Sequence, residues 1–449
     1  MAGATLTTVN NILKEYYLGP VQEQLNNEVL LIQRLEARSE DLVGKAAYIP
    51  LHTGRSSGIG AIAESAILPT AGSQSYDRAE YDLKYLYGRV QVTGPSMAKT
   101  KSDAGSFLQI LRSELDGIRN DLKKDLARQS YGKGDGVIAT SASQSWSSGA
   151  ATTNTLTLAD WEPLRKGQVY VGMLVDVVSY SSGTPTVLNT AATVSAVSIV
   201  AAATSTVTLT FASATPTSGW ATASLTRTGV VGSFNRWALG QRSMEIDGLQ
   251  RIVTSVTPTD NSSSPYTTEA KSGTLGKIDA YANQYWDNQR TFGATPGTLE
   301  PLTLQRVQQA MNLSRTKAGN PTVLLTSLGV LREFYRLLTV TQQFISNEGT
   351  MDFKAGFQTI AYNGVPVVGD IDAPYGKMYV LDESTLKVFS DQDWHFLDAD
   401  GQTLRQVPNY DAFEAVLARY MNLGASNRAK NVVINDISVN GTTTADIGV

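Results

Sequence analysis

The sequence contains no cysteine, only two histidines and few charged residues for its length. Charged side chains make up 17% of its 449 residues, and the formal net charge is −4. The absence of cysteine excludes disulfides, thiolate zinc sites, iron–sulfur clusters and cysteine nucleophiles. His52 and His395 stand far apart, so no paired-histidine zinc motif can be written. The acidic balance also gives no basic surface of the kind that tight nucleic-acid binding usually needs.

Signals for membrane targeting are missing as well. The first residues, Met1–Thr8, lack the basic and apolar regions of a signal peptide. No run approaches the roughly 18 apolar residues that a spanning helix requires. We therefore expect no membrane partner.

The N-terminal third is expected to consist of an arm and a long excursion. Residues 9–38 are predicted to form two helical pieces broken at Gly19-Pro20. Segment 45–51 is typical of a short strand, and the tyrosine-rich run 81–92 is typical of a second one. About thirty weakly patterned residues separate them. A loop of that length is uncommon inside a compact domain and is usually functional or docked elsewhere.

The clearest helix is predicted over Asp103–Tyr131, with Asp103 as its cap and Gly132 ending it. Its faces away from the apolar stripe carry mixed charge. Acidic neighbours on every turn favour a solvated or inter-subunit face over phosphate binding by Lys123 and Lys124. The stripe is formed by Phe107, Leu111, Leu115, Ile118, Leu122 and Leu126.

A neutral stretch follows this helix. The fifty residues 177–226 contain no Asp, Glu, Lys or Arg, and 21 of them are Ser or Thr. Short strand-like runs with turn residues between them predict a small all-β barrel or sandwich inserted over residues 137–234. A low-complexity linker is the competing interpretation, and the regular strand spacing argues against it. Strands are expected at 173–178, 193–200, 204–211 and 221–228.

The C-terminal half is predicted to mix helices and strands. Asn363-Gly364 is a strong hairpin turn between apolar strands within Phe357–Val368. The tail 440–449 is expected to be loose. The other expected elements are helices at 303–317 and 327–338, a buried strand at 321–325, a β meander at 377–381, 386–389 and 394–397, and strands at 412–423 and 432–437.

Glycine-rich motifs give no nucleotide site. Gly132-Lys-Gly-Asp-Gly136 follows a helix instead of a strand, so a hinge into the insert is the better interpretation. Gly276-Lys277 lacks the upstream glycine of a phosphate-binding loop. We predict no cofactor-binding residue.

Acidic and histidine residues give no metal site or catalytic centre either. The acidic cluster around Trp394 lacks the central Gly and terminal Glu of a calcium loop, which favours turn-forming aspartates. His52 and His395 lack a serine-nucleophile context and are expected to pack or hydrogen-bond. We predict no catalytic residue, no metal site and no enzymatic activity. The acidic cluster comprises Asp391, Asp393, Asp398 and Asp400.

The order of these parts resembles the major capsid proteins of tailed bacteriophages, which have the Hong Kong 97-type fold. Three stretches carry the likeness. The first runs from Lys45-Ala-Ala-Tyr-Ile-Pro through Gly94 to the Asp103–Tyr131 helix. The second runs from Thr322-Val-Leu-Leu-Thr-Ser through Asn363-Gly-Val-Pro-Val-Val-Gly-Asp to Met378-Tyr-Val-Leu-Asp. The third combines Asn409–Tyr420 with Asn427-Arg428 and Val432-Val-Ile.

The resemblance implies an α+β fold with an N-arm, an extended loop, a spine helix, and peripheral and axial domains, carrying an inserted small β-barrel-like domain. The implied division is an arm at 1–47, the extended hairpin loop at 48–95, the peripheral domain with the spine helix at 96–136, the inserted all-β domain at 137–234, the peripheral domain continued at 235–295, the axial domain at 296–395, and peripheral return strands with the tail at 396–449.

The implied function is a structural subunit of an icosahedral or prolate head. Copies would form pentamers and hexamers, with the arm and extended loop lying across neighbours, and would enclose double-stranded DNA by non-specific contact. The implied partners are other copies, a separate scaffolding protein, a portal protein and decoration proteins. The implied location is the virion, with assembly in the host bacterial cytoplasm. Some members cross-link Lys to Asn; Lys45, Lys84 and Asn363 are present, but no spacing supports that chemistry here.

Two alternatives stay open from the sequence. One is an encapsulin-like nanocompartment shell of the same fold. The other is a secreted β-rich surface or S-layer protein, against which the missing signal peptide argues. The role of the insert is also open among subunit stabilisation, two-fold contacts and docking of decoration proteins.

Overall fold

The computed structural model describes part of the chain. The described residues are 30–36, 39–41, 46–64, 67–96, 110–143, 153–158, 162–181, 184–199, 205–210, 223–227, 244–254, 274–279, 283–291, 299–341, 360–397 and 404–439. The predicted arm before residue 30, the start of the long helix and the tail 440–449 lie outside them.

The chain divides into two compact units, each taken by itself. The smaller unit contains residues 87–125 and 394–419, and the larger contains 29–86, 126–393 and 420–449. In the larger unit, α2 (Leu30–Glu36) lies within the range predicted to be helical and buries Ile32 and Leu35.

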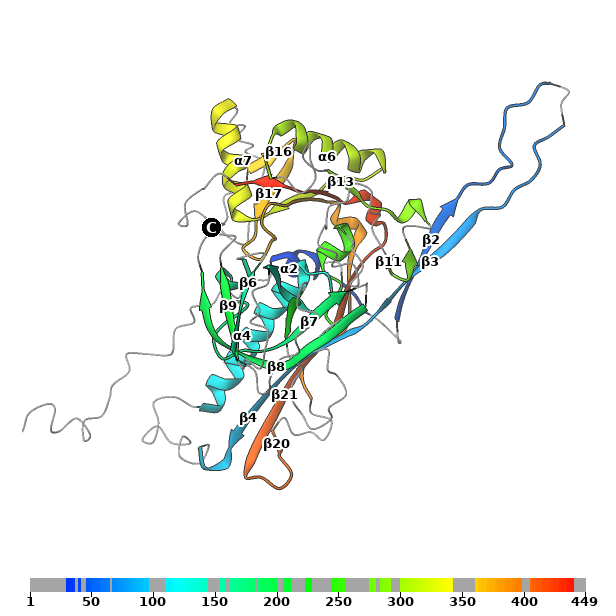
Figure 1. Ribbon diagram of the computed structural model, residues 1–449. Helices are drawn as coiled ribbons and strands as arrows, with labels where there is room; N and C mark the ends of the chain where they lie inside the picture. Colours follow the sequence, from blue (N-terminus) through cyan, green and yellow to red (C-terminus); the bar gives the residue numbers. More distant parts are fainter. Residues whose placement is uncertain are drawn as a thin grey trace, which may run out of the picture. The chain divides into compact units, whose positions relative to one another are not determined.

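A six-stranded mixed sheet forms one core of the larger unit, and helices α6 and α7 pack near it (Figure 1). The helices α6 (Leu304–Thr316) and α7 (Leu328–Thr341) confirm two sequence predictions, and Thr303 caps α6 by accepting from the Arg306 N–H. Asn363 and Gly364 both have positive φ, which confirms the predicted hairpin turn. In order, the strands are β13 (Gln289–Thr291), β22 (Val432–Ile434), β18 (Met378–Leu381), β15 (Val323–Thr326), β17 (Val365–Gly369) and β16 (Ile360–Tyr362).

The predicted β meander after residue 377 is wrong. Strand β18 belongs to the six-stranded sheet, whereas β19 (Leu386–Phe396) pairs with β1 (Ser39–Asp41) in a different sheet. The short 3₁₀ turn at Glu383–Thr385, capped by Asp382, leads the chain from one sheet to the other. The two strands expected at 386–389 and 394–397 are one continuous strand.

The expected strand at 432–437 is also two strands. β22 ends at Ile434 and β23 (Ile437–Ser438) pairs with β14 (Glu300–Pro301). Asp436 has a φ of 57°, which no regular strand allows.

The second sheet is built on β19 and on β21 (Ala412–Ala425). Its strand order is β1-β19-β21-β20, with β4 (Lys84–Thr93) also pairing with β21. Strand β20 (Arg405–Gln406) pairs antiparallel with residues 413 and 414 of β21. The strand predicted at 412–423 is thereby confirmed, with two more residues.

The predicted excursion is a hairpin, but its second strand differs from the expected one. β2 (Ala46–Gly54) pairs antiparallel with β3 (Ser75–Asp82), and the loop between them spans residues 55–74. The run 81–92 is broken at Leu83. The buried side chains before this residue stand at odd positions, Ala79 and Tyr81, and those after it stand at even positions, beginning with Leu86. That change from odd to even positions exchanges the two strand faces and separates β3 from β4.

Helix α4 (Ile110–Tyr131) confirms the predicted long helix over its described length, about 33 Å at 1.5 Å per residue. Within its stripe Leu126 is fully buried, while Leu115, Ile118 and Leu122 are half-buried. The predicted cap Asp103 lies outside the described residues. Among the described residues, no helix has the length and apolar character needed to cross a membrane.

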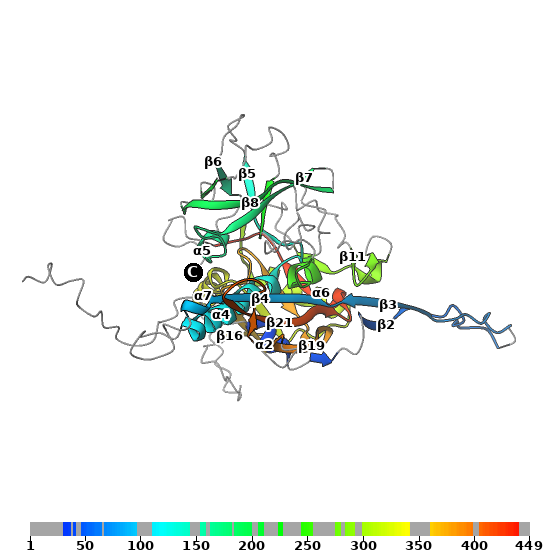
Figure 2. The ribbon, with the colours of Figure 1, turned by 90° about the horizontal axis from the view of Figure 1, so that it is seen from below.

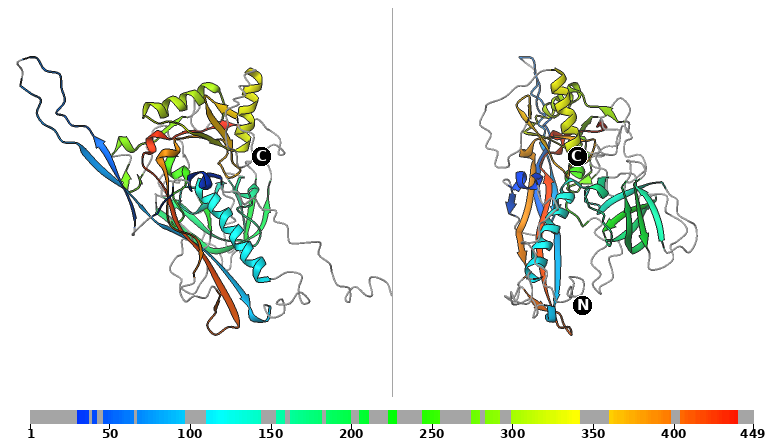
Figure 3. Two further views of the ribbon diagram at one scale, coloured as in Figure 1. Left: turned by 180° about the vertical axis from the view of Figure 1, so that it is seen from behind. Right: turned by 90° about the vertical axis from the view of Figure 1, so that its left-hand side faces the viewer.

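The insert is a closed six-stranded barrel with its own core (Figures 2 and 3). Val175, Val177, Val194, Val207 and Leu209 are fully buried inside it. Two of its strands escape prediction from the sequence, because Ser and Thr obscure their alternation. In order around the barrel, the strands are β10 (Ala223–Arg227), β5 (Val137–Ser143), β6 (Thr153–Leu158), β9 (Thr206–Thr210), β8 (Thr184–Ser198) and β7 (Leu174–Ser181).

Candidate assembly interface

The loop of the β2–β3 hairpin exposes aliphatic side chains. Ile67 is 93% exposed and Leu68 is 77% exposed, and Ile59 is similarly open. The two arms of the loop are tied together, because the Ser56 hydroxyl donates to the Gly72 carbonyl at 2.9 Å. We call residues 55–74 the hairpin tip. An ordered loop with exposed aliphatic side chains is typical of a surface that binds another protein.

The base of the hairpin is anchored by a buried tyrosine. Tyr81 in β3 stacks on Phe389 of β19, with ring centroids 5.4 Å apart. Its hydroxyl donates to the Ala425 carbonyl at 2.8 Å and accepts from the Ala425 N–H at 3.1 Å. Burial raises the pKa of the Tyr81 phenol far above its ordinary value, so the hydroxyl stays neutral and keeps both roles.

A second segment of the larger unit also contacts strand β3. We call residues 274–286, as far as they are described, the clasp. The Glu80 N–H donates to the Gly276 carbonyl at 2.9 Å, and Lys277 forms an ion pair with Glu80. The Lys277 ammonium also lies 3.7 Å from the Asp82 carboxylate. Gly276 has a φ of 58°, and a Cβ there would lie only 3.1 Å from Cζ of Tyr81, which favours glycine at this position.

Tyr285 adds a further contact between the clasp and the hairpin. Its hydroxyl donates to Asp77 Oδ2 at 2.7 Å. That hydrogen bond, and then the one from the Arg78 N–H, lowers the pKa of Asp77. Burial, followed by the bond to Asp77, raises the pKa of Tyr285 to about 12. The hairpin base is therefore fixed from both sides, and these polar contacts of the clasp fall on residues 77–82, outside the tip.

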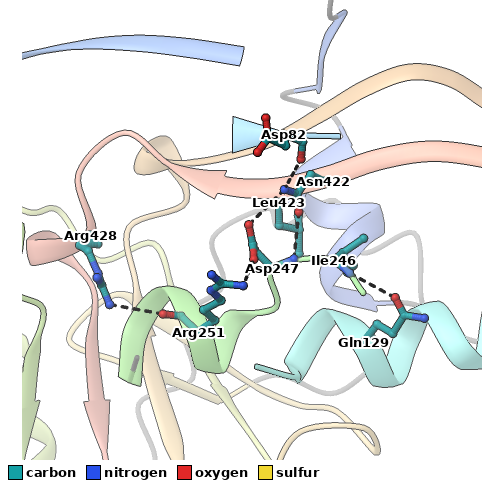
Figure 4. Close-up of polar contacts among 8 residues, drawn as sticks. All are labelled: Asp82, Gln129, Ile246, Asp247, Arg251, Asn422, Leu423 and Arg428. Carbon is teal, nitrogen blue, oxygen red and sulfur yellow. Dashed lines mark hydrogen bonds and ion pairs between the residues drawn. The ribbon is translucent and has the colours of Figure 1, made fainter. Parts of the chain in front are cut away.

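Behind the anchor lies a buried polar junction centred on Asn422 of β21 (Figure 4). Its side-chain NH₂ donates to the Asp82 carbonyl at 2.7 Å and to Asp247 Oδ2 at 3.1 Å. Its oxygen accepts from the Asp247 N–H at 2.9 Å and from the Leu423 N–H at the same distance. One amide thus joins the hairpin, strand β21 and the loop around residue 247.

The junction continues into charged groups. Arg251 Nη1 lies 2.6 Å from Asp247 Oδ1, and the Ile246 N–H donates to Gln129 Oε1 of α4 at 3.3 Å (Figure 4). The buried Arg428 guanidinium donates to the Ile252 carbonyl at 3.0 Å and to the Arg251 carbonyl at 3.3 Å. These carbonyls lie in the π-helical turn Gln250–Thr254, so a buried cation caps a group of backbone acceptors.

The two histidines occupy separate elements. His52 Nε2 lies 2.7 Å from Gln74 Oε1, and its ring is 5.4 Å from that of Tyr76 beside the hairpin tip. His395 is half-buried in β19. The hydrogen-bond partner of His52 is an amide, which is not a group that an imidazole could activate as a nucleophile.

The acidic cluster around Trp394 is described only in part. Asp391 and Asp393 are exposed within strand β19, so the prediction that they form a turn is wrong, whereas Asp398 and Asp400 lie outside the described residues. Over the part of the chain that is described, no three metal-ligating side chains come together.

The remaining residues named from the sequence lie at a strand end, in turns or outside the described part. Lys45 lies outside, Lys84 begins β4, and Asn363 sits exposed in its hairpin turn. Gly134 and Gly136 both have positive φ where the chain enters the barrel.

Sequence reasoning missed the residues that fix the hairpin. Tyr285 and Lys277 meet β3 from positions about two hundred residues away, at sequence separations of 208 and 197. The one local signal was Gly276-Lys277, whose positive φ values mark a tight turn and not a phosphate loop.

Comparison with solved structures identifies the fold. The chain matches one from the capsid asymmetric unit of cyanophage A-1(L) with a TM-score of 0.59 and 16% identity, over 97% of this chain and 99% of that chain. The capsid of a native GTA particle matches with a TM-score of 0.49 and 8% identity, over 98% and 100% of the two chains. The holo-SrpI encapsulin of Synechococcus elongatus PCC 7942 matches with a TM-score of 0.46 and 8% identity, over 99% of each.

The latter two likenesses fall below a TM-score of 0.5, so the assignment of the fold rests on the cyanophage chain alone. No protein-family model matches the sequence, and no curated protein matches it. The cyanophage likeness spans nearly all of both chains, and it confirms the Hong Kong 97-type fold with an α+β composition.

Proposed function

We propose that the chain is the structural subunit of a phage head, in which copies associate as pentamers and hexamers and enclose double-stranded DNA. The observation that carries this proposal is the hairpin tip, with the large aliphatic side chains of Ile67 and Leu68 exposed on a chain with a capsid-subunit fold. A lone two-stranded hairpin is marginal in water, so a partner surface is needed for its outer part.

The proposal gives a role to the contacts that fix the hairpin base. Tyr81, Tyr285 and Lys277 hold β3 from two sides. A fixed base presents the tip in one direction and reduces the entropy lost on docking. Head-to-tail contacts of this kind close into rings. Each contact can be weak, because many form at once within the same ring.

The same proposal covers partners and location. The function is structural and not enzymatic. We propose a separate scaffolding protein, a portal protein and decoration proteins as partners, with DNA contacted non-specifically. The site of action is the virion, and assembly takes place in the host bacterial cytoplasm. The division into arm, extended loop, peripheral domain, inserted barrel and axial domain belongs to the same proposal.

The direct test is the assembly state of the purified chain. Sedimentation velocity and negative-stain microscopy should find closed shells far larger than the 48.2 kDa chain, or capsomers that close on addition of the scaffolding protein. A stable monomer under all conditions would defeat the proposal. The contents decide between a phage head and a nanocompartment of the same fold: nuclease-protected double-stranded DNA supports the first, and co-purified protein cargo supports the second.

A further inference from the structure

The loop at residues 370–377, here called the junction loop, receives contacts from several elements of the larger unit. The hydroxyl of Tyr131, the last residue of α4, donates to Asp370 Oδ2 at 2.5 Å, and both side chains are buried. The Asp370 N–H donates to the Thr326 carbonyl at 2.9 Å. At the other end of the loop, the Ile437 N–H donates to the Gly376 carbonyl at 2.9 Å.

The same loop holds the inserted barrel. The Tyr375 N–H donates to Glu162 Oε1 at 2.8 Å. The Lys166 ammonium donates to the Ala373 carbonyl at 3.0 Å and lies 3.0 Å from the Glu162 carboxylate. Both charged side chains are largely buried, so water screens these contacts little. Two backbone groups of the loop are therefore bound by an ion pair that belongs to the barrel, here called the latch.

The barrel side of this latch is rigid. Glu162 opens the short helix α5 (Glu162–Arg165), whose Pro163 and Leu164 are buried. Leu164 is part of the barrel core, so Glu162 and Lys166 cannot shift far without disturbing that core. The chain enters the barrel through Gly134 and Gly136, both at positive φ. Both glycines are buried, and a Cβ at Gly134 would lie 3.0 Å from the Ile246 carbonyl, so this entry turn is a second packed connection of the barrel to the rest of the larger unit.

The conformation of the junction loop depends on the Asp370 carboxylate, which accepts a hydrogen bond from Tyr131 of α4. Asp370 Oδ2 accepts from Tyr131, and Asp370 Oδ1 accepts from the Asp372 N–H at 3.0 Å. Asp372 is followed directly by Ala373, the fully buried residue whose carbonyl Lys166 binds. Only three consecutive peptide units separate Asp370, which Tyr131 contacts, from the carbonyl of Ala373 that Lys166 binds.

We propose that the junction loop couples the end of helix α4 to the inserted barrel. The Tyr131–Asp370 hydrogen bond fixes the conformation of the loop, and the contacts of Glu162 and Lys166 with the loop depend on that conformation. The two contacts share no atom. If the other contacts of the loop alone fixed its conformation, loss of one of the two would leave the other unchanged. Coupling makes them reciprocal: loosening either one loosens the other. The inference does not depend on the proposed function, because it concerns one chain in whatever assembly it forms.

Hydrogen exchange read residue by residue tests this directly, because two amides report the two contacts. The Asp372 N–H reports the Asp370 side, and the Tyr375 N–H reports the latch. In Tyr131→Phe, we expect exchange at Asp372 to rise about tenfold and exchange at Tyr375 to rise at least about threefold. A rise at Asp372 with Tyr375 unchanged would overturn the coupling.

The reciprocal variant keeps the test decisive if Tyr131→Phe folds poorly. Glu162→Ala should speed exchange at Tyr375 and also at Asp372, although the Glu162 carboxylate binds the opposite end of the loop. Glu162→Gln keeps an acceptor for the Tyr375 N–H and should give a smaller effect. Arg165→Gln, an exposed neighbour on α5, is the matched control and should change neither amide. An effect of Glu162→Ala confined to Tyr375 also overturns the proposal.

Discussion

The Tyr81 hydroxyl and the backbone of Ala425 form a closed pair of hydrogen bonds, in which the hydroxyl donates to the carbonyl at 2.8 Å and accepts from the N–H at 3.1 Å. The two residues are 344 positions apart, and both are buried. This pair ties the extended hairpin to the end of β21. Together with the clasp, it fixes the base of the hairpin that carries the exposed tip.

Replacing Tyr81 by Phe removes the hydroxyl and keeps the ring. The Ala425 N–H and carbonyl are then buried without this partner, and we expect the free energy of unfolding to fall by about 1–3 kcal/mol. Urea denaturation of the unassembled chain measures it. Tyr76→Phe, in the same strand but 74% exposed, should stay within about 0.5 kcal/mol. Equal effects of the two variants would contradict the anchoring role.

Replacing Gly248 and Gly117 by alanine should change the stability of the protein in opposite directions. A Cβ at Gly248 would overlap the backbone at the end of α4, lying 2.6 Å from the Gly132 nitrogen and closer still to the carbonyls of Gln129 and Gly132. Gly248→Ala should therefore cost about 3 kcal/mol. Gly117 lies within α4, and a Cβ there meets nothing within 4 Å.

Gly117→Ala should consequently stabilise the protein by about 0.5–1 kcal/mol, since alanine is the better helix former. Thermal denaturation should show the melting temperature falling for Gly248→Ala and rising for Gly117→Ala. A tolerated alanine at position 248 would mean that the loop around Asp247 does not pack on the end of α4.

The Tyr285–Asp77 contact should limit the pH range over which the clasp holds. The folded pKa of Asp77 lies below its ordinary 3.8, so its contribution is present above that value and is lost as pH falls through the folded pKa. The pKa of Tyr285 is raised from 10.0 to about 12, so its contribution is present below pH 10 and is lost as pH rises through about 12.

A difference titration at the phenolate absorbance, wild type minus Tyr285→Phe, isolates this tyrosine among the 19. The midpoint should lie near 12 and should move toward 10 when Asp77→Asn removes the charge. Part of the shift should persist, because burial is its largest cause. An unchanged midpoint in Asp77→Asn would show that the hydrogen bond is not formed.

Charge on the hairpin tip should block assembly without harming the fold. Ile67→Asp together with Leu68→Asp places two carboxylates where the proposal puts a desolvated contact. We expect the closed-shell fraction to fall at least about tenfold in sedimentation, with an unfolding free energy within about 0.5 kcal/mol of wild type. Thr70→Asp, an exposed polar position on the same tip, is the matched control and should assemble. Normal shells from the double variant would exclude the tip from the assembly contact.

Local patterns predicted the helices, the barrel and the hairpin turn. Helix α6 lies within the range 303–317 predicted for it, and the barrel follows from strand-like runs in a stretch without charge. The break at Leu83 was also present in the pattern, because the apolar residues change from odd to even positions there. The break was overlooked because Tyr81 before it and Tyr85 and Tyr87 after it all stand at odd positions, although only Tyr81 is buried.

Long-range polar contacts could not be predicted in the same way. Asn422 and Asp247 are 175 positions apart, and neither sequence neighbourhood marks them as partners. The sheet change after Asp382 depends on a three-residue 3₁₀ turn, which strand propensity does not reveal. The clasp was missed for the same reason, since Tyr285 and Asp77 meet only once the chain is folded.

The proposed function depends above all on the hairpin tip docking on another copy of the chain in a closed shell. A cryo-electron microscopy reconstruction of the purified particle examines this contact itself, because it locates residues 55–74 relative to every neighbour. We expect rings of five and six copies, with Ile67 and Leu68 of each hairpin buried against an adjacent copy. A reconstruction in which those side chains face solvent or their own chain would show that the tip does not hold the shell together.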